Sequence, residues 1–177
     1  MEKKKGKGCL KYVIIFVVLL GGAIFGIVQL ANNVQKEQDA DKANLVFDAL
    51  SFFDGKDATV NEQKLIEKLG EPDSTEEWNY ETGTKVFPIR TLVYDQYRYD
   101  FNSEMLQRIE IDGVDIPYTD KDKILALFGL KKYGYSVVTD TGVAYRVKNC
   151  GVHDFWIPIM DEQNLKSIRI SYGTLFD

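Results

Sequence analysis

Cysteine and histidine are scarce in this sequence: its 177 residues hold two cysteines, Cys9 and Cys150, and one histidine, His153. Because Cys150 is the only cysteine after residue 31, that part of the chain forms no internal disulfide. A metal site built on Cys150, His153 and Asp154 would lack a fourth ligand. Positions three apart on one strand also point to opposite faces, so we expect no thiol–imidazole pair.

Other patterns that carry common chemistry are missing as well. No glycine-rich phosphate loop is present, because the glycines are scattered at expected turns. The neighbouring carboxylates Glu76 and Glu77, and those of Asp120 and Asp122, fall in predicted turns and helix starts, where they serve as caps and solvated surface. We therefore predict no catalytic residue, no metal and no cofactor, and a protein that is not an enzyme.

Positive charge is in short supply after residue 31. That part holds 17 lysines and arginines against 26 aspartates and glutamates, a net charge of −9, and the whole chain has −5. Nucleic acid and anionic lipid surfaces require a basic footprint, so neither is expected as the main partner. Residues 1–11 differ, with five lysines against one glutamate.

A long apolar run, residues 12–31, carries no charge and one polar residue, Gln29. As a helix it would span roughly 30 Å, the thickness of a bilayer's hydrocarbon core. With the lysines of residues 1–11 before it, the run predicts a single-pass membrane protein with a cytoplasmic N-terminus. A cleaved signal peptide is the alternative, but its apolar core is shorter and a small residue would stand in place of Gln29.

Two further features concern this N-terminal part. Gly22 and Gly26 form a small-xxx-small pair that can bring two membrane helices together, although an unpaired helix is the favoured interpretation. Acylation of Cys9 stays open. Residues 32–44 read as a polar stalk, and residues 45–177 as one domain outside the cell, the size of an ordinary globular domain.

Residues 55–172 repeat themselves at a constant offset of 59, which predicts units over residues 55–113 and 114–172. The clearest matches are Lys64, Leu65, Leu69 and Gly70 with Lys123, Ile124, Phe128 and Gly129, and Leu106, Ile109 and Ile111 with Leu165, Ile168 and Ile170.

Each unit is expected to open with a short helix, capped by Asn61 in the first and Asp120 in the second. Alternating apolar and polar residues then predict strands, among them residues 85–94 and 96–101 in the first unit. In the second unit the strands include residues 143–147, 152–160 and 165–172. The predicted fold class is α+β: an N-terminal transmembrane helix, then two helix-plus-four-stranded antiparallel sheet repeats forming one curved sheet.

The first unit holds four short motifs: Leu69-Gly70-Glu71-Pro72, Trp78-Asn79-Tyr80, Tyr97-Arg98-Tyr99-Asp100-Phe101 and Leu106-Gln107-Arg108-Ile109. Together they resemble the motifs of the SmpA/OmlA (BamE-like) family. The tandem arrangement resembles the beta-lactamase inhibitor protein family, in which two such units form one concave sheet that grips its partner. The second unit departs from the pattern, because Phe128-Gly129-Leu130-Lys131 lacks the proline. The resemblance implies a concave face that binds another protein.

Aromatic residues are dense on the predicted strands. Each of them can be plain core, but tryptophan and tyrosine exposed on an open sheet are typical of protein-binding surfaces. The candidate partner-binding residues are Trp78, Tyr80, Tyr97, Tyr99, Tyr133, Tyr135 and Trp156. We predict a membrane-anchored bacterial cell-surface module, inhibitor-like or envelope-associated, that binds a protein partner. The alternative is an accessory or sensory subunit of a membrane complex that binds a small or wall-derived ligand.

Overall fold

The computed structural model describes residues 45–54 and 59–177, all within the unit Leu45–Asp177. Among these residues no helix is long and apolar enough to cross a membrane. The longest, α2 (Glu62–Leu69), has eight residues and so spans about 12 Å, well short of a bilayer. The predicted tail 1–11, membrane helix 12–31 with its Gly22–Gly26 pair, and stalk 32–44 lie outside the described residues. The prediction of a single-pass cell-membrane protein is corrected on this finding, because the described residues supply no membrane-spanning helix.

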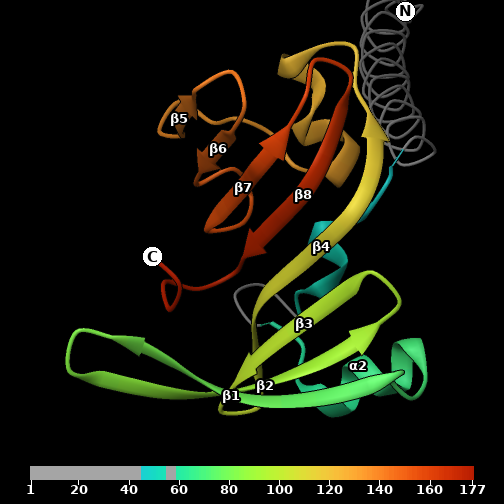
Figure 1. Ribbon diagram of the computed structural model, residues 1–177, viewed down its shortest axis with the longest axis vertical. Helices are drawn as coiled ribbons and strands as arrows, with labels where there is room; N and C mark the ends of the chain where they lie inside the picture. The colour runs from blue at the N-terminus through green and yellow to red at the C-terminus, as the bar shows by residue number, and fades with distance from the viewer. Residues whose placement is uncertain (1–44, 55–58) are drawn as a thin grey trace, which may run out of the picture. The chain divides into compact units, whose positions relative to one another are not determined.

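Eight strands form one antiparallel sheet in the order β1-β2-β3-β4-β8-β7-β6-β5 (Figure 1). Strands β4 and β8 pair at its centre, so the sheet consists of two four-stranded meanders joined along these strands. The first meander comprises β1 (Ser74–Thr82), β2 (Lys85–Tyr94), β3 (Tyr97–Asn102) and β4 (Met105–Pro117). The second comprises β5 (Val137–Asp140), β6 (Tyr145–Lys148), β7 (Asp154–Met160) and β8 (Asn164–Ser171).

The predicted fold class of two equivalent helix-plus-sheet repeats is wrong, because only the first meander has an α-helix. Asn61 caps α2 by accepting a hydrogen bond from the Lys64 amide, as its sequence position predicts. The corresponding segment of the second meander forms two 3₁₀ turns, η2 (Lys121–Lys123) and η3 (Leu125–Phe128). Its backbone bonds join residues three apart, and Gly129 ends the segment in a left-handed conformation with φ 69°.

All four described helices, including η1 (Ala49–Phe52), lie on the same face of the sheet. Alternation along the strands explains why this face is covered: β4 sends Ile109 and Ile111 into the core, and β8 sends Ile168 and Ile170. The residues between them point to the opposite face. We call that opposite side the open face, because no helix of the described residues packs on it.

The β1–β2 hairpin extends beyond the rest of the sheet. Strand β3 pairs with β2 only over residues 90–94, so the end of the hairpin continues as a two-stranded ribbon (Figure 1). We call residues 79–89 the arm. Trp78 and Tyr80 point from β1 to the open face at the base of this arm, because Trp78 bonds there to Thr91.

Candidate binding face

One row of side chains crosses the open face from β3 to β6. Cross-strand register places these residues directly opposite one another, which brings their side chains into contact. The row runs Arg98, Glu110, Arg169, Trp156 and Arg146.

Trp156 stands at the centre of a cationic stack in this row. The guanidinium carbons of Arg146 and Arg169 lie 5.3 and 5.1 Å from its ring centre, on neighbouring strands. Arginine beside an indole ring makes a favourable cation–π contact, so the two arginines hold the half-buried ring in place. The stack presents a partly exposed aromatic ring together with two cations.

Glu110 lies beneath this stack. Its side chain is 13% exposed and forms ion pairs with the Arg108 guanidinium at 3.0 Å and with the Arg169 Nε atom at 3.1 Å. Burial raises the pKa of the Glu110 carboxyl, while Arg108 lowers it and Asp100 raises it further. A carboxylate is therefore held inside the face while the arginines reach outward.

A second row fixes the other half-buried tryptophan, Trp78. The Trp78 indole N–H donates to the Thr91 hydroxyl at 2.9 Å, and that hydroxyl donates to the Asp100 carboxylate at 2.6 Å. The Arg108 Nε atom donates to the other Asp100 oxygen at 2.9 Å. Thr91 and Asp100 are buried, so this chain of bonds sets the orientation of Trp78 from below.

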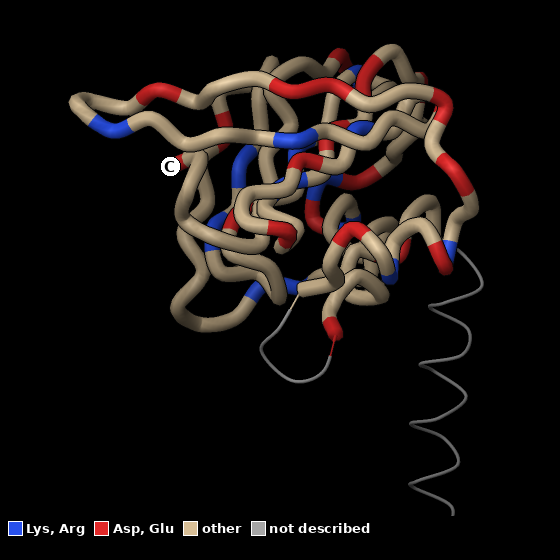
Figure 2. Tube along the Cα trace, turned by 90° about the horizontal axis from the view of Figure 1, so that it is seen from below, with Lys and Arg blue, Asp and Glu red and all other residues tan. Residues whose placement is uncertain are grey.

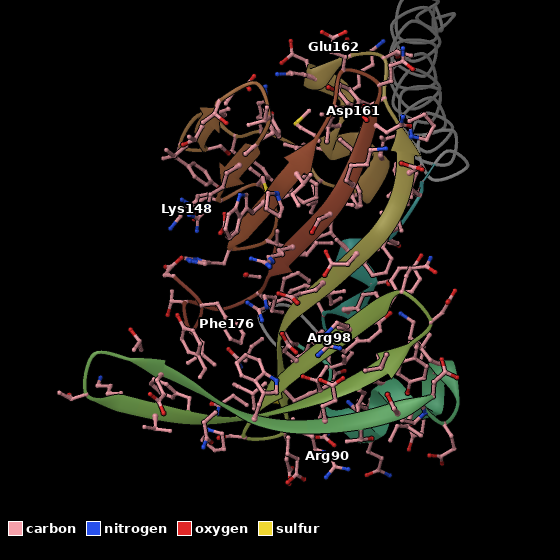
Figure 3. All side chains as sticks on the ribbon, in the orientation of Figure 1. Arg90, Arg98, Lys148, Asp161, Glu162 and Phe176 are labelled. Carbon is pink, nitrogen blue, oxygen red and sulfur yellow. The ribbon has the colours of Figure 1, made fainter. Side chains whose placement is uncertain are left out.

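The last residues of the sequence fold back onto the open face. The ring of Phe176 lies 6.3 Å from Trp78 and 4.9 Å from Tyr80, and the Arg108 guanidinium lies 3.8 Å from its centre. Asp177 accepts from the Lys148 ammonium at 2.9 Å and lies 2.9 Å from the His153 ring. Figure 3 shows Phe176 projecting toward the β1–β2 arm, with Lys148 at the end of β6.

The structure divides the seven predicted partner-binding residues among three places. Trp78, Tyr80 and Trp156 lie on the open face. Tyr97 and Tyr99 lie on the covered face, where Tyr97 stacks on Phe47 and Tyr99, 3% exposed, packs against Phe52.

Tyr133 and Tyr135 form a third group, stacked on each other at 5.4 Å in the loop before β5. Both are exposed, Tyr135 by 68%. They stand apart from the rows described above and contact neither tryptophan among the described contacts.

Sequence reasoning missed the arginines and the C-terminal phenylalanine of this face. Arg108 alternates with Ile109 and Arg169 with Ile168 and Ile170, so the strand pattern places both arginines opposite the core. Cross-strand register brings Arg169 to Trp156 and Arg108 to Asp100, and local alternation does not contain that register. Phe176 lies after the last strand and has no periodic signal.

The thiol and the imidazole do not act together. Cys150 is fully buried and its thiol donates to the Val147 carbonyl, while His153 contacts Asp177. Burial raises the pKa of Cys150 to about 11. Within the described residues no group of three or more histidine, cysteine, aspartate or glutamate side chains is arranged to hold a metal ion.

Two open hollows lie on the other side of the arm, next to α2. Their volumes are about 490 and 660 Å³, and both are bordered by Glu62, Arg90 and Glu104. Arg90 pairs with Glu62 at 3.0 Å across them. The residues that border both hollows are thus a solvated Arg90–Glu62 ion pair and a further glutamate. Among the described residues, no buried side chain without a hydrogen-bond partner borders either hollow.

No family model, curated protein or solved structure matches the chain. The resemblance to the BamE-like and beta-lactamase inhibitor protein families therefore stays a prediction, and the site rests on its own geometry.

Proposed function

We propose that this chain is a binding protein that holds a partner protein on the open face of its sheet. The observation that carries the proposal is Trp156, half-buried between Arg146 and Arg169 on a face that no described helix covers. Tryptophan, tyrosine and arginine dominate the binding energy of protein interfaces, and here they come from six strands, all except β2 and β5.

Both tryptophans of the open face are held in fixed orientations before any partner binds. The Thr91 hydroxyl orients Trp78, and the two guanidinium groups hold Trp156. A side chain that is fixed before binding loses little conformational entropy on binding, so such residues give more net affinity. Strands also place side chains more rigidly than loops do.

The depth of the charges indicates the chemistry of the partner. The side chains of Asp100 and Asp154 are 2% and 6% exposed, whereas those of Arg98, Arg146 and Arg169 are 32%, 32% and 34% exposed. Acidic positions are spread over the described unit (Figure 2), and on the open face the 47% exposed Glu76 pairs with Arg98. Around Trp156, however, the acidic partners Asp154 and Glu110 are only 6% and 13% exposed, so this part of the face offers solvent mainly cations and an aromatic ring. It fits a protein surface that presents carboxylates around an apolar anchor.

Affinity capture with the full chain tests the proposal. The immobilised protein is exposed to extracts of its source cells, and a captured protein is then purified and its affinity measured directly. We expect Trp156→Ala to weaken binding at least tenfold, since central aromatic anchors typically contribute that much. Arg98→Ala, which breaks only an exposed pair with Glu76, should weaken binding while leaving the fold intact.

Tyr135→Ala is the matched control, because it removes an exposed aromatic ring away from the open face. Circular dichroism and urea unfolding establish that each variant is folded. A partner bound equally by wild type, Trp156→Ala and Arg98→Ala would overturn the proposal, and so would the absence of any captured protein that depends on Trp156.

A further inference from the structure

Phe176 is seated on the open face like a ligand side chain. Trp78 and Tyr80 contact its ring from the arm side, and the Arg108 guanidinium covers it at 3.8 Å. Two aromatic rings and a cation around one ring form an aromatic-binding pocket. None of these three contacts belongs to the core on the covered face.

Asp177 occupies a separate basic position beside this pocket. Its two carboxylate oxygens meet Lys148 and His153, each at 2.9 Å, and Arg146 Nη2 lies 3.9 Å away. The hydrogen bond from Lys148 is the main cause that lowers the pKa of Asp177; burial opposes it, and the contact with His153 lowers the pKa further. The position therefore prefers a charged carboxylate to a neutral group.

Side chains hold the segment more than its backbone does. The last backbone hydrogen bond from this end of the chain to the sheet, within the described part, runs from the Tyr172 amide to the Gln107 carbonyl. Beyond it the Asp177 amide bonds only to Thr174 in its own turn, at 3.3 Å. Residues 173–177 can therefore leave the face without breaking the sheet.

We propose that Phe176 and Asp177 occupy a subsite for an aromatic–acidic residue pair, and that a partner segment with this pair binds there by displacing them. This inference rests on the proposed function, because it names the partner chemistry that the same face selects. Residues 173–177 show which side chains the subsite accepts. While they occupy it, they also lower its apparent affinity for a partner segment.

Effective concentration sets the affinity that the test must detect. A segment tethered by a few residues experiences about 1–10 mM of its own site. If it is seated about nine-tenths of the time, the same residues in a free peptide bind an empty site with a Kd of about 0.1–1 mM. The segment's own occupancy then weakens binding of that peptide to the wild type about tenfold.

The test uses the full chain with Phe176→Ala, which empties the ring pocket. The probe is the peptide Gly-Thr-Leu-Phe-Asp, amidated at its C-terminus and titrated to about 5 mM, a concentration well above the expected Kd. The Trp78 indole N–H resonance reports binding by NMR, and Trp156→Ala assigns which of the chain's two indole resonances belongs to Trp78. We expect binding at least tenfold tighter to Phe176→Ala than to wild type.

Two control peptides separate the halves of the subsite. Replacing phenylalanine by alanine in the peptide should weaken binding at least tenfold, and replacing aspartate by asparagine should weaken it severalfold. Lys148→Ala in the protein should remove the preference for aspartate over asparagine. No response of the Trp78 resonance up to about 5 mM, or equal binding of the alanine peptide, would overturn the inference.

The outcomes also separate the subsite from the proposed function. Peptide binding without a partner that depends on Trp156 keeps the subsite and rejects the function. A partner that binds Phe176→Ala no more tightly than wild type, together with no peptide binding, keeps the function and rejects the subsite.

Discussion

Replacing Arg108 by methionine should be among the most damaging changes on the open face. The Asp100 and Arg108 side chains are 2% and 14% exposed, and they meet through bonds of 2.8 and 2.9 Å. Without the guanidinium, the Asp100 carboxylate keeps only the Thr91 hydroxyl as a hydrogen-bond partner among the described contacts. An uncompensated buried charge of this kind costs about 3–5 kcal/mol.

The residual exposure of Arg108 places the expected loss near the lower end of that range, about 3 kcal/mol. Losing the cation over Phe176 adds about 0.5–1 kcal/mol. We therefore expect Arg108→Met to lower the free energy of unfolding by about 3–4 kcal/mol, which a domain with about 5–15 kcal/mol survives.

Urea unfolding of the full chain, followed by far-ultraviolet circular dichroism, measures this loss. Asp100→Asn alone should cost about 1.5–3 kcal/mol, because it weakens charged hydrogen bonds but leaves no buried charge unpaired. The double variant should cost clearly less than the sum of the two, by about 2 kcal/mol, since the stranded carboxylate is then absent. Arg98→Ala, which breaks an exposed pair with Glu76, is the control and should cost at most about 1 kcal/mol.

Two results would contradict a buried, mutually dependent Asp100–Arg108 pair. One is additivity of the two single changes within about 0.5 kcal/mol, and the other is a cost of Arg108→Met no larger than that of Arg98→Ala. Either result would mean that water reaches Asp100 freely and that Trp78 is oriented by packing instead of by this network.

Three further predictions concern the core, the thiol and the C-terminal segment. Phe155→Ala removes a fully buried ring and should cost about 3–5 kcal/mol in urea unfolding, and a loss below about 1 kcal/mol would contradict the packing. With its pKa raised to about 11, the Cys150 thiol in a Cys9→Ser chain should resist Ellman's reagent at pH 8 until urea unfolds the protein, so fast labelling of the native chain would refute its burial. Because its pKa is lowered, Asp177 should stay charged and seated above about pH 4 and dissociate as the pH falls through its lowered value, which NMR of the Trp78 indole would report. Asp177→Asn should abolish that pH transition. A transition that persists in this variant would belong to another titrating group and would contradict the prediction.

Period-two alternation predicts most strands of the first meander from sequence. Strand β2 spans the residues predicted for it, 85–94, and β3 lies one residue beyond its predicted range of 96–101. The signal is strong here because each strand has one apolar face and one polar face. In the second meander a strand was predicted over residues 143–147, but β6 begins two residues later, at Tyr145. The strand is short because β5 pairs with it over only four residues.

Alternation cannot decide which face a tyrosine joins. Tyr97 and Tyr99 share a face, as their spacing predicts, but that face is the covered one. Tyrosine suits both a core and an interface, so the choice depends on what packs above it, and here Phe47 and Phe52 do. The binding face itself arises from contacts between strands far apart in sequence.

The two meanders are alike on the covered face and different on the open face. Their hairpins share the offset of 59 residues: Phe101 pairs with Leu106, and Met160 with Leu165. Apolar residues on the covered face match at this offset, as Ile109 matches Ile168.

Open-face positions at the same offset do not match. Asp100 and Arg108 correspond to Ile159 and Ser167, and these also pair with each other across two strands. Packing against the helices constrains the covered face alike in both meanders, whereas the open face carries a buried ion pair in one and an exposed isoleucine in the other. A partner that spans the open face must therefore contact two chemically different halves, which fits an asymmetric protein surface better than a two-fold symmetric ligand.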